Sequence, residues 1–486
     1  MKILYSRYNI RLIFELFFII FVGLFVAKAV LQTSAMEEKW SKALILGLIG
    51  VTGLIVIPDQ EKFLLYFAAF LLPFSLSFNP VYIERNFFRP VNGFEIKAFD
   101  FPLAIIIFFW VMRLMRTREK IQLHLCITLP YLIIFGFCVA SLTRVTALPA
   151  VKAGVLFLVL KNPIIFLYLA NNLSERRILF ALIGVLLLNG SLQSLIAIAQ
   201  YAKGGPIGLR MLGEMDNLYA SKSGMETLSR MGGTVGHPNK LALVLAFLLE
   251  VNFAVLFLNA STWVRWIRIL PILLMLPAII LTYSRSAWAS LVLGGTLNVY
   301  WCRSKKTQQK IISALLVVGV FSTVAGASIA LIPSVRNRLF ADDGGSGDLV
   351  REELKIVAKN IIYHHYWLGV GLNNYTSVVR KFDNSTTGVT WGFAMPVHNE
   401  YYLTAAEIGI PAAVVFVILL AVILFIHIKI GFEDKDKEYP YIAIGFLCGW
   451  IGWAFHHKNL FEYVFFQHDI WFYLGIILAL KNNLQE

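Results

Sequence analysis

Hydrophobic and polar residues follow one another along this chain in long blocks. Apolar runs of about 17–25 residues recur from end to end, and a helix of that length crosses a hydrocarbon core of about 30 Å. A membrane β-barrel would instead show weak alternation within segments of about ten residues. The pattern predicts an all-α, polytopic helical membrane protein with about 12–14 transmembrane helices. The expected spans are 10–31, 43–57, 63–78, 99–115, 123–142, 151–170, 178–200, 239–258, 267–283, 286–302, 311–332, 401–427, 440–456 and 460–480.

Two details of this pattern affect the count of spans and the domain organisation. The second and third runs are short, and together they could form a re-entrant hairpin, which leaves the count open. The first run, Ile10–Leu31, is too long for a signal peptide and lacks a small-residue cleavage site, so we expect a retained span. We expect a single membrane domain over residues 1–486 with one large external loop, 333–400.

Composition and charge support a membrane protein and argue against a nucleic-acid partner. The chain is 58% hydrophobic and only 15% charged, whereas soluble domains are about a quarter charged. Its net charge of +14 is attributed to basic loops on the inner face of the membrane. Lysine and arginine in short loops favour the cytoplasmic side, which would place both termini inside. Five successive predicted inner loops are basic: those containing Arg113–Lys120, Arg176/Arg177, Arg265/Arg268, Arg303–Lys310 and Lys429–Lys437.

The opposite loops are then external, and they are also basic. Positive charge placed against the insertion bias suggests an anionic ligand on the outer side. The alternative is that long loops cross the membrane regardless of their charge. The outer cations are Arg85, Arg89, Lys97, Lys203, Arg210, Lys222, Arg230, Arg336, Arg338, Arg351 and Lys355.

Two basic motifs lie on this predicted outer side. The first runs from Arg230 through Gly232-Gly233-Thr234-Val235-Gly236 to His237-Pro238-Asn239, at a helix start where free N–H groups attract anions. A simple turn is the alternative. The second, Thr282–Trp288, places Arg285 close to the hydrocarbon, where a charge is costly unless it is paired or snorkels to water. The arginine fork suits phosphate oxygens, which makes Arg285 our main candidate.

Two further motifs frame the end of the large loop. An amphipathic stretch near 349–366 contains Arg351, which is either a ligand contact or a solvated charge, and Trp367–Tyr375 follows it. The last motif is His398-Asn399-Glu400-Tyr401-Tyr402, with Glu407 behind it. A neutral imidazole at His398 could accept a proton from a sugar hydroxyl near pH 7, although a lone histidine is often structural.

Metal and thiol chemistry have little support in the sequence. The histidine pairs 364/365 and 456/457 show no metal-protease spacing, and we expect no metal and no cofactor. The four cysteines lack CxxC spacing, so we expect no disulfide or thiolate zinc site. His468 and Asp469 lie in the last apolar run, where a proton-coupled transporter could use such a pair. The acidic pair Asp434/Asp436 belongs to a charged inner run and is taken as solvated.

In their order along residues 225–415, these four motifs resemble the O-antigen ligase and O-antigen polymerase superfamily of bacterial envelope enzymes. The matching pieces are Arg230 with GxxGHPN, then SRxAW, then GVGxNxY, then HNEYY followed by Glu407-Ile408-Gly409-Ile410-Pro411. The resemblance implies a glycan donor linked to undecaprenyl diphosphate, used on the periplasmic side of the bacterial inner membrane without metal. It also implies that Arg230 and Arg285 hold the diphosphate while His398 orients or deprotonates the acceptor hydroxyl.

The resemblance leaves the acceptor open. Ligases use lipid A core, polymerases a second lipid-linked glycan, and related enzymes a protein serine or threonine; we favour a ligase slightly. A flippase of lipid-linked sugars is the non-enzyme alternative, although transporters usually place their charges within spans near the midplane. The remaining substrate-binding candidates for the diphosphate and glycan are Arg210, His237, Asn239, Arg351, Tyr375, Asn399, Glu400 and Glu407.

Overall fold

The computed structural model describes residues 59–83, 90–223, 226–302, 307–340, 346–392, 394–433, 438–458 and 463–485. Helices dominate this part of the chain, and its strands form two small hairpins, so the predicted all-α class is confirmed. The predicted spans 10–31 and 43–57 lie outside the described residues.

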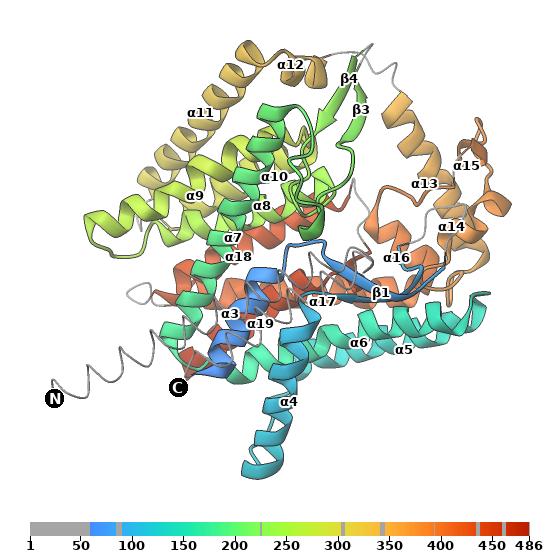
Figure 1. Cartoon of the computed structure of the whole chain (residues 1–486), viewed down its shortest axis with the longest axis horizontal. Helices are drawn as coiled ribbons and strands as arrows, with labels where there is room; N and C mark the ends of the chain where they lie inside the picture. The colour runs from blue at the N-terminus through green and yellow to red at the C-terminus, as the bar shows by residue number, and fades with distance from the viewer. Residues whose placement is uncertain are drawn as a thin grey trace, which may run out of the picture.

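The helices of the first half begin with α3 and continue to α10 (Figure 1). Their bounds are α3 Gln60–Leu71, α4 Asp100–Thr117, α5 Leu125–Ser141, α6 Pro149–Asn172, α7 Arg176–Lys203, α8 Pro238–Val255, α9 Thr262–Leu281 and α10 Arg285–Cys302. At 12 residues, α3 is about 18 Å long, which is too short to cross a hydrocarbon core.

The second half contains long helices again, separated by several short ones. Their bounds are α11 Thr307–Leu331, α12 Pro333–Phe340, α13 Ser346–His364, α14 Tyr375–Val378, α15 Val389–Gly392, α16 Glu400–Ile408, α17 Ile410–Gly431, α18 Tyr439–His456 and α19 His468–Gln485. Figure 1 shows α13 to α16 grouped on the right, while the C-terminus lies at the lower left.

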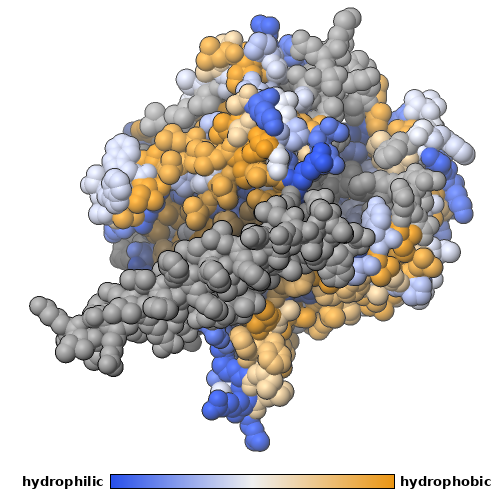
Figure 2. All heavy atoms as spheres, in the orientation of Figure 1, coloured by the Kyte–Doolittle hydropathy of each residue, from blue (hydrophilic) through white to orange (hydrophobic). Residues whose placement is uncertain are grey.

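Six of the described helices are long and apolar enough to cross a membrane: α5, α6, α7, α8, α9 and α17. The protein is therefore a multi-pass membrane protein. Helix α8 is buried on almost all sides and packs against α10 and α18, which places it at the centre of the helical body. Helix α9 is mostly exposed, and apolar side chains gather on the face over α9 and α11 at the upper left of Figure 2. That exposure is expected of a surface that faces lipid.

The two hairpins lie in segments predicted only as outer loops. Strand β1 (Ser77–Tyr82) pairs antiparallel with β2 (Gly93–Lys97), and β3 (Tyr219–Ser223) pairs antiparallel with β4 (Glu226–Arg230). The β3–β4 hairpin positions a candidate site residue, because β4 ends on Arg230.

The single span predicted over 401–427 is wrong, because Gly409 divides it into α16 and α17. Gly409 has φ +92°, and a Cβ there would lie 2.1 Å from the carbonyl oxygen of Trp367. Pro411 then stands in the first turn of α17, where a missing N–H costs nothing. The length of an apolar run does not predict such a break; only the glycine within the run indicates it.

The segment 333–400, predicted as one large loop, contains several helices. The amphipathic stretch expected near 349–366 is confirmed as α13. It buries Leu354, Val357, Ala358 and Ile361, a spacing that forms one apolar stripe. The amide of Asn360 on α13 donates to the carbonyl of Phe382 at 2.8 Å, which connects this helix to a later part of the loop.

Candidate active site

The glycine-rich loop before α8 is fixed by hydrogen bonds to α7 and to the segment before β1. The side-chain oxygen of Gln193 accepts from the N–H of Thr234 at 3.0 Å, and its amide nitrogen donates to the Thr234 hydroxyl at 2.6 Å. The N–H of Ser75 donates to the carbonyl of Thr234 at 3.0 Å. Gly236 has φ +91°, which an L side chain rarely adopts. The loop therefore presents the start of α8 in one orientation.

His237 caps that helix, and Arg230 connects it to the next motif. The Nδ1 of His237 accepts from the N–H of Asn239 at 3.2 Å. The guanidinium of Arg230, only 5% exposed, donates through Nε to the carbonyl of Thr282 at 2.8 Å and through its Nη2 to the side-chain oxygen of Asn239. The first and second motifs, 52 residues apart, are thus in direct contact.

The turn between α9 and α10 places Arg285 at the first position of α10. Tyr283 adopts φ +54° while buried, an uncommon conformation for a bulky residue. The indole N–H of Trp288 donates back to the carbonyl of Ile279 at 3.1 Å and holds the turn closed. Arg285 is exposed on the surface of the protein. A cation at a helix N-terminus is repelled by the helix dipole, so the site favours an anionic ligand.

His398 lies within electrostatic reach of the other basic groups. Burial, followed by the charge of Arg351, lowers the pKa of His398 to about 4. Burial, Arg230 and Lys240, with smaller contributions from His398 and His456, lower the pKa of His237 to about 4. We call Arg230, His237, Arg351 and His398 the basic cluster. Its histidines are neutral at pH 7, so its positive charge comes from the arginines.

Asn399 and Glu400 connect the start of α16 to the chain beyond α18. The side-chain oxygen of Asn399 accepts from the N–H groups of Tyr401 and Tyr402, both at 3.1 Å, and its amide donates to the carbonyl of Lys458 at 3.0 Å. Glu400 is buried, and its carboxylate accepts from the N–H groups of Tyr463 at 3.1 Å and Val464 at 2.8 Å. Both side chains fix the start of α16, which directly follows His398 in the chain; a direct contact with substrate stays a prediction.

Glu407 organises the GVGxNxY motif in a similar way. Its carboxylate accepts from three successive N–H groups, those of Asn373 at 3.0 Å, Asn374 at 3.0 Å and Tyr375 at 2.9 Å. The backbone N–H of Gly371 donates to the Glu407 carbonyl at 2.9 Å. Tyr375 itself is fully buried. The third and fourth motifs are therefore one packed unit, and for Tyr375 and Glu407 a binding role stays a prediction.

Arg210 is the candidate that lies apart from these contacts. It is exposed and forms an ion pair with Asp216, itself exposed, through a 2.6 Å contact. Surface pairs of this kind contribute little to stability.

Two lysines near the basic cluster were not among the candidate site residues, although Lys97 was counted among the outer cations. Lys240 lies in the first turn of α8, inside a predicted span, where a charged residue could have marked it. Lys97 ends β2, and burial together with the charges of Lys240 and Lys161 lowers its pKa to about 8. Among the described residues, no three histidine, cysteine or acidic groups gather in a metal-binding arrangement.

Residues 270–417 match a family model, that of the O-antigen ligase. This segment of the chain is similar to the O-antigen ligase family. The predicted resemblance to the O-antigen ligase and polymerase superfamily is thereby confirmed, and glycan transfer is supported at the level of the family. The match includes Arg285 and the third and fourth motifs, while Arg230 and the α8 start precede it. No curated protein matches the chain.

Proposed function

We propose that this protein is a periplasmic-side glycosyltransferase of the inner membrane that moves a glycan from undecaprenyl diphosphate to an acceptor hydroxyl. One observation carries the proposal: Arg230 forms hydrogen bonds both to the turn that presents Arg285 and to Asn239 at the start of α8. An exposed arginine, a buried arginine and two helix N-termini all favour the same kind of ligand, an anion such as a diphosphate.

In the proposed reaction, the acceptor oxygen forms a bond to the anomeric carbon as the bond from that carbon to the diphosphate oxygen breaks. Arg285 contacts the departing diphosphate, and Arg230 positions the turn and adds its charge. Stabilising charge that develops on a leaving group is often the largest catalytic contribution. A neutral His398 accepts the proton of the acceptor hydroxyl, which its depressed pKa permits at pH 7.

Diphosphate leaves as a stable anion, so the scheme needs neither a general acid nor a metal. A single displacement predicts inversion at the anomeric carbon. NMR of the product that showed retention would exclude this scheme.

We propose lipid A core as the acceptor, because the matched family is the ligase. A polymerase or a protein O-oligosaccharyltransferase would share the donor site and differ only in the acceptor. A flippase is disfavoured because the candidate residues gather around helix ends and connecting segments.

The deciding experiment is transfer by the purified protein in detergent with lipid-diphosphate glycan, lipid A core and EDTA. Product on lipid A core supports a ligase, and a ladder of lengthened donor supports a polymerase. No transfer with either acceptor, with or without added metal, would reject the glycosyltransferase. A liposome assay showing that Arg285→Ala abolishes donor translocation would favour the flippase instead.

A further inference from the structure

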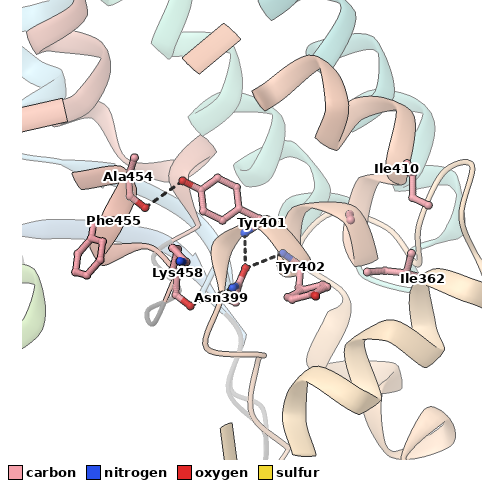
Figure 3. A pocket seen from close by; sticks show the side chains of 9 residues that line it. Ile362, Asn399, Tyr401, Tyr402, Ile410, Ala454, Phe455 and Lys458 are labelled. Carbon is pink, nitrogen blue, oxygen red and sulfur yellow. Dashed lines mark hydrogen bonds between the residues drawn. The ribbon is translucent and has the colours of Figure 1, made fainter. Parts of the chain in front are cut away.

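An open pocket of about 800 Å³ lies beside the basic cluster and is not part of it. It is lined by Ile362 of α13, by Asn399 and the first turns of α16, by Ile410 at the start of α17, and by Ala454, Phe455 and Lys458 at the end of α18. Figure 3 shows Lys458 and Asn399 on one side of the pocket, Ile362 and Ile410 on the other, and two tyrosines between them.

Of the two tyrosines in the centre, Tyr401 is held by a hydrogen bond and Tyr402 lies near a lysine. The hydroxyl of Tyr401 donates to the carbonyl of Ala454 at 3.1 Å, so its ring bridges α16 and α18. The ammonium of Lys359 lies 5.9 Å from the centre of the Tyr402 ring. An aromatic face beside lysines is a suitable surface for a sugar ring that carries an anionic group.

The two ends of the pocket have opposite polarity. Lys458 is exposed and forms no ion pair within the described part of the chain, so an anion would find an available charge there. At the other end, Ile410 begins an exposed apolar stripe on α17 that continues through Val414, Val417 and Ile418. This stripe lies on a predicted span, and its exposure is that of a lipid-facing surface. A ligand that fits both ends has a lipid tail and an anionic head.

Different sides of the α18 end face this pocket and the helices α8 and α10. Gly449 and Gly452 face α8 and α10, where added Cβ atoms would meet Phe247 and Ser290. Ala454, Phe455 and Lys458 line the pocket on another side of the same helix end. Asn399, which lines the pocket, directly follows His398 in the chain. His398 therefore directly precedes a residue of the pocket and also belongs to the basic cluster, as the base in a transfer between two substrates should.

We infer that this pocket is the acceptor site, and that its occupant is a glycolipid whose head-group sugar carries a phosphate. Lys458 pairs with that phosphate, the Tyr402 ring contacts the sugar, and the lipid tail follows the apolar stripe of α17 into the membrane. The acceptor hydroxyl then faces His398. This inference rests on the proposed function and adds what that proposal lacks, the residues that select the acceptor.

The test measures steady-state transfer by the full chain while acceptor and donor concentrations are varied separately. We expect Lys458→Ala to raise the KM for a phosphorylated acceptor about tenfold, which corresponds to roughly 1.4 kcal/mol, and to change kcat less than twofold. Lys458→Arg should restore most of the loss. The control is Lys381→Ala, which removes another exposed lysine on the same predicted side and should leave both KM values unchanged.

Removing the phosphate from the acceptor sharpens the test. The dephosphorylated acceptor should show a raised KM with the wild-type protein, and Lys458→Ala should add nothing further. Tyr402→Ala should raise the acceptor KM with either acceptor, whereas Tyr402→Phe should not, because the ring is kept.

Several results would overturn the inference. An acceptor KM unchanged in Lys458→Ala and Tyr402→Ala would do so. A donor KM raised in place of the acceptor KM would make the pocket a donor site, and equal effects of Lys458→Ala on both acceptors would remove the phosphate contact. A direct binding assay with the phosphorylated glycolipid distinguishes failure of the pocket inference from failure of the proposed function. Binding lost in Lys458→Ala, without transfer by wild type, would reject the function and keep the pocket.

Discussion

The basic and acidic residues of the four motifs have different surroundings, although the sequence presents them together. Arg285 is exposed at the start of a helix, and His398 lies among other basic groups. Glu400 and Glu407 are buried, and both direct their carboxylates at backbone N–H groups. The acidic residues thus hold the loop by its backbone, and we propose that the basic residues act in the chemistry.

This difference explains why the site has a strongly positive character. A carboxylate whose oxygens are already engaged by N–H groups cannot approach an anionic substrate as a free charge. Its oxygens are used to hold the chain, and the positive charge of the cluster comes from the arginines. Substitutions of the basic residues should therefore lower the rate of catalysis, whereas substitutions of the acidic residues should lower the stability of the protein.

The largest effect is expected from Arg285→Ala. Loss of a cation that stabilises the leaving diphosphate should lower kcat by about 10²–10³-fold, while the protein stays folded because the side chain is exposed. Arg285→Lys should recover only part of the loss, because lysine lacks the bidentate fork. Initial rates and the melting temperature in detergent measure both quantities. Wild-type activity in Arg285→Ala would remove this residue from the mechanism.

A large effect of another kind is expected from Glu407→Gln. The substitution leaves a neutral amide against three N–H groups, and its own NH₂ can only repel those donors. We expect a loss of about 1–3 kcal/mol of stability, measured as a lower denaturation midpoint. The KM values of the surviving folded protein should stay near wild type. A normal midpoint with lost activity would instead show that Glu407 acts on substrate, as the motif alone suggests.

The sequence could predict features that depend on local periodicity, but not contacts between distant residues. Apolar run lengths located most helices, and the spacing of Leu354, Val357, Ala358 and Ile361 located α13, because both depend on local periodicity. The common side of Arg230 and Arg285 followed from loop charges. Their connection through Thr282, and the direction of the Glu407 carboxylate, depend on contacts across 52 and about 34 residues, which no local pattern encodes.

An intermediate effect is expected in the pH dependence. The folded pKa of His398, about 4, is below its ordinary value of 6.5, so the fold favours the neutral imidazole. Its contribution to stability is complete above about pH 6.5 and is lost as the pH falls towards 4. Activity should likewise stay nearly constant from pH 8 to about 5.5 and then decline. Rates are measured after brief exposure to each pH, and stability is measured separately. The two measurements distinguish the loss of activity from the loss of stability. A decline centred near pH 6.5 would contradict the depressed pKa.

The smallest effect is expected from Arg351→Gln, which separates the two causes of that depressed pKa. Burial is the larger cause and the Arg351 charge the smaller, so removing the charge should raise the pKa of His398 without restoring 6.5. The acid limb of the rate profile should move to higher pH by about half a unit to one unit, as expected for one partly screened charge. Lys355→Gln is the matched control, because Lys355 lies one turn along α13 and pairs with Glu352 at 2.6 Å. An equal shift in both variants would reflect the general charge of α13, whereas a shift in Arg351→Gln alone would place Arg351 beside the base. High salt should reduce that shift less than it reduces any effect of Lys355, because Arg351 acts on a half-buried imidazole.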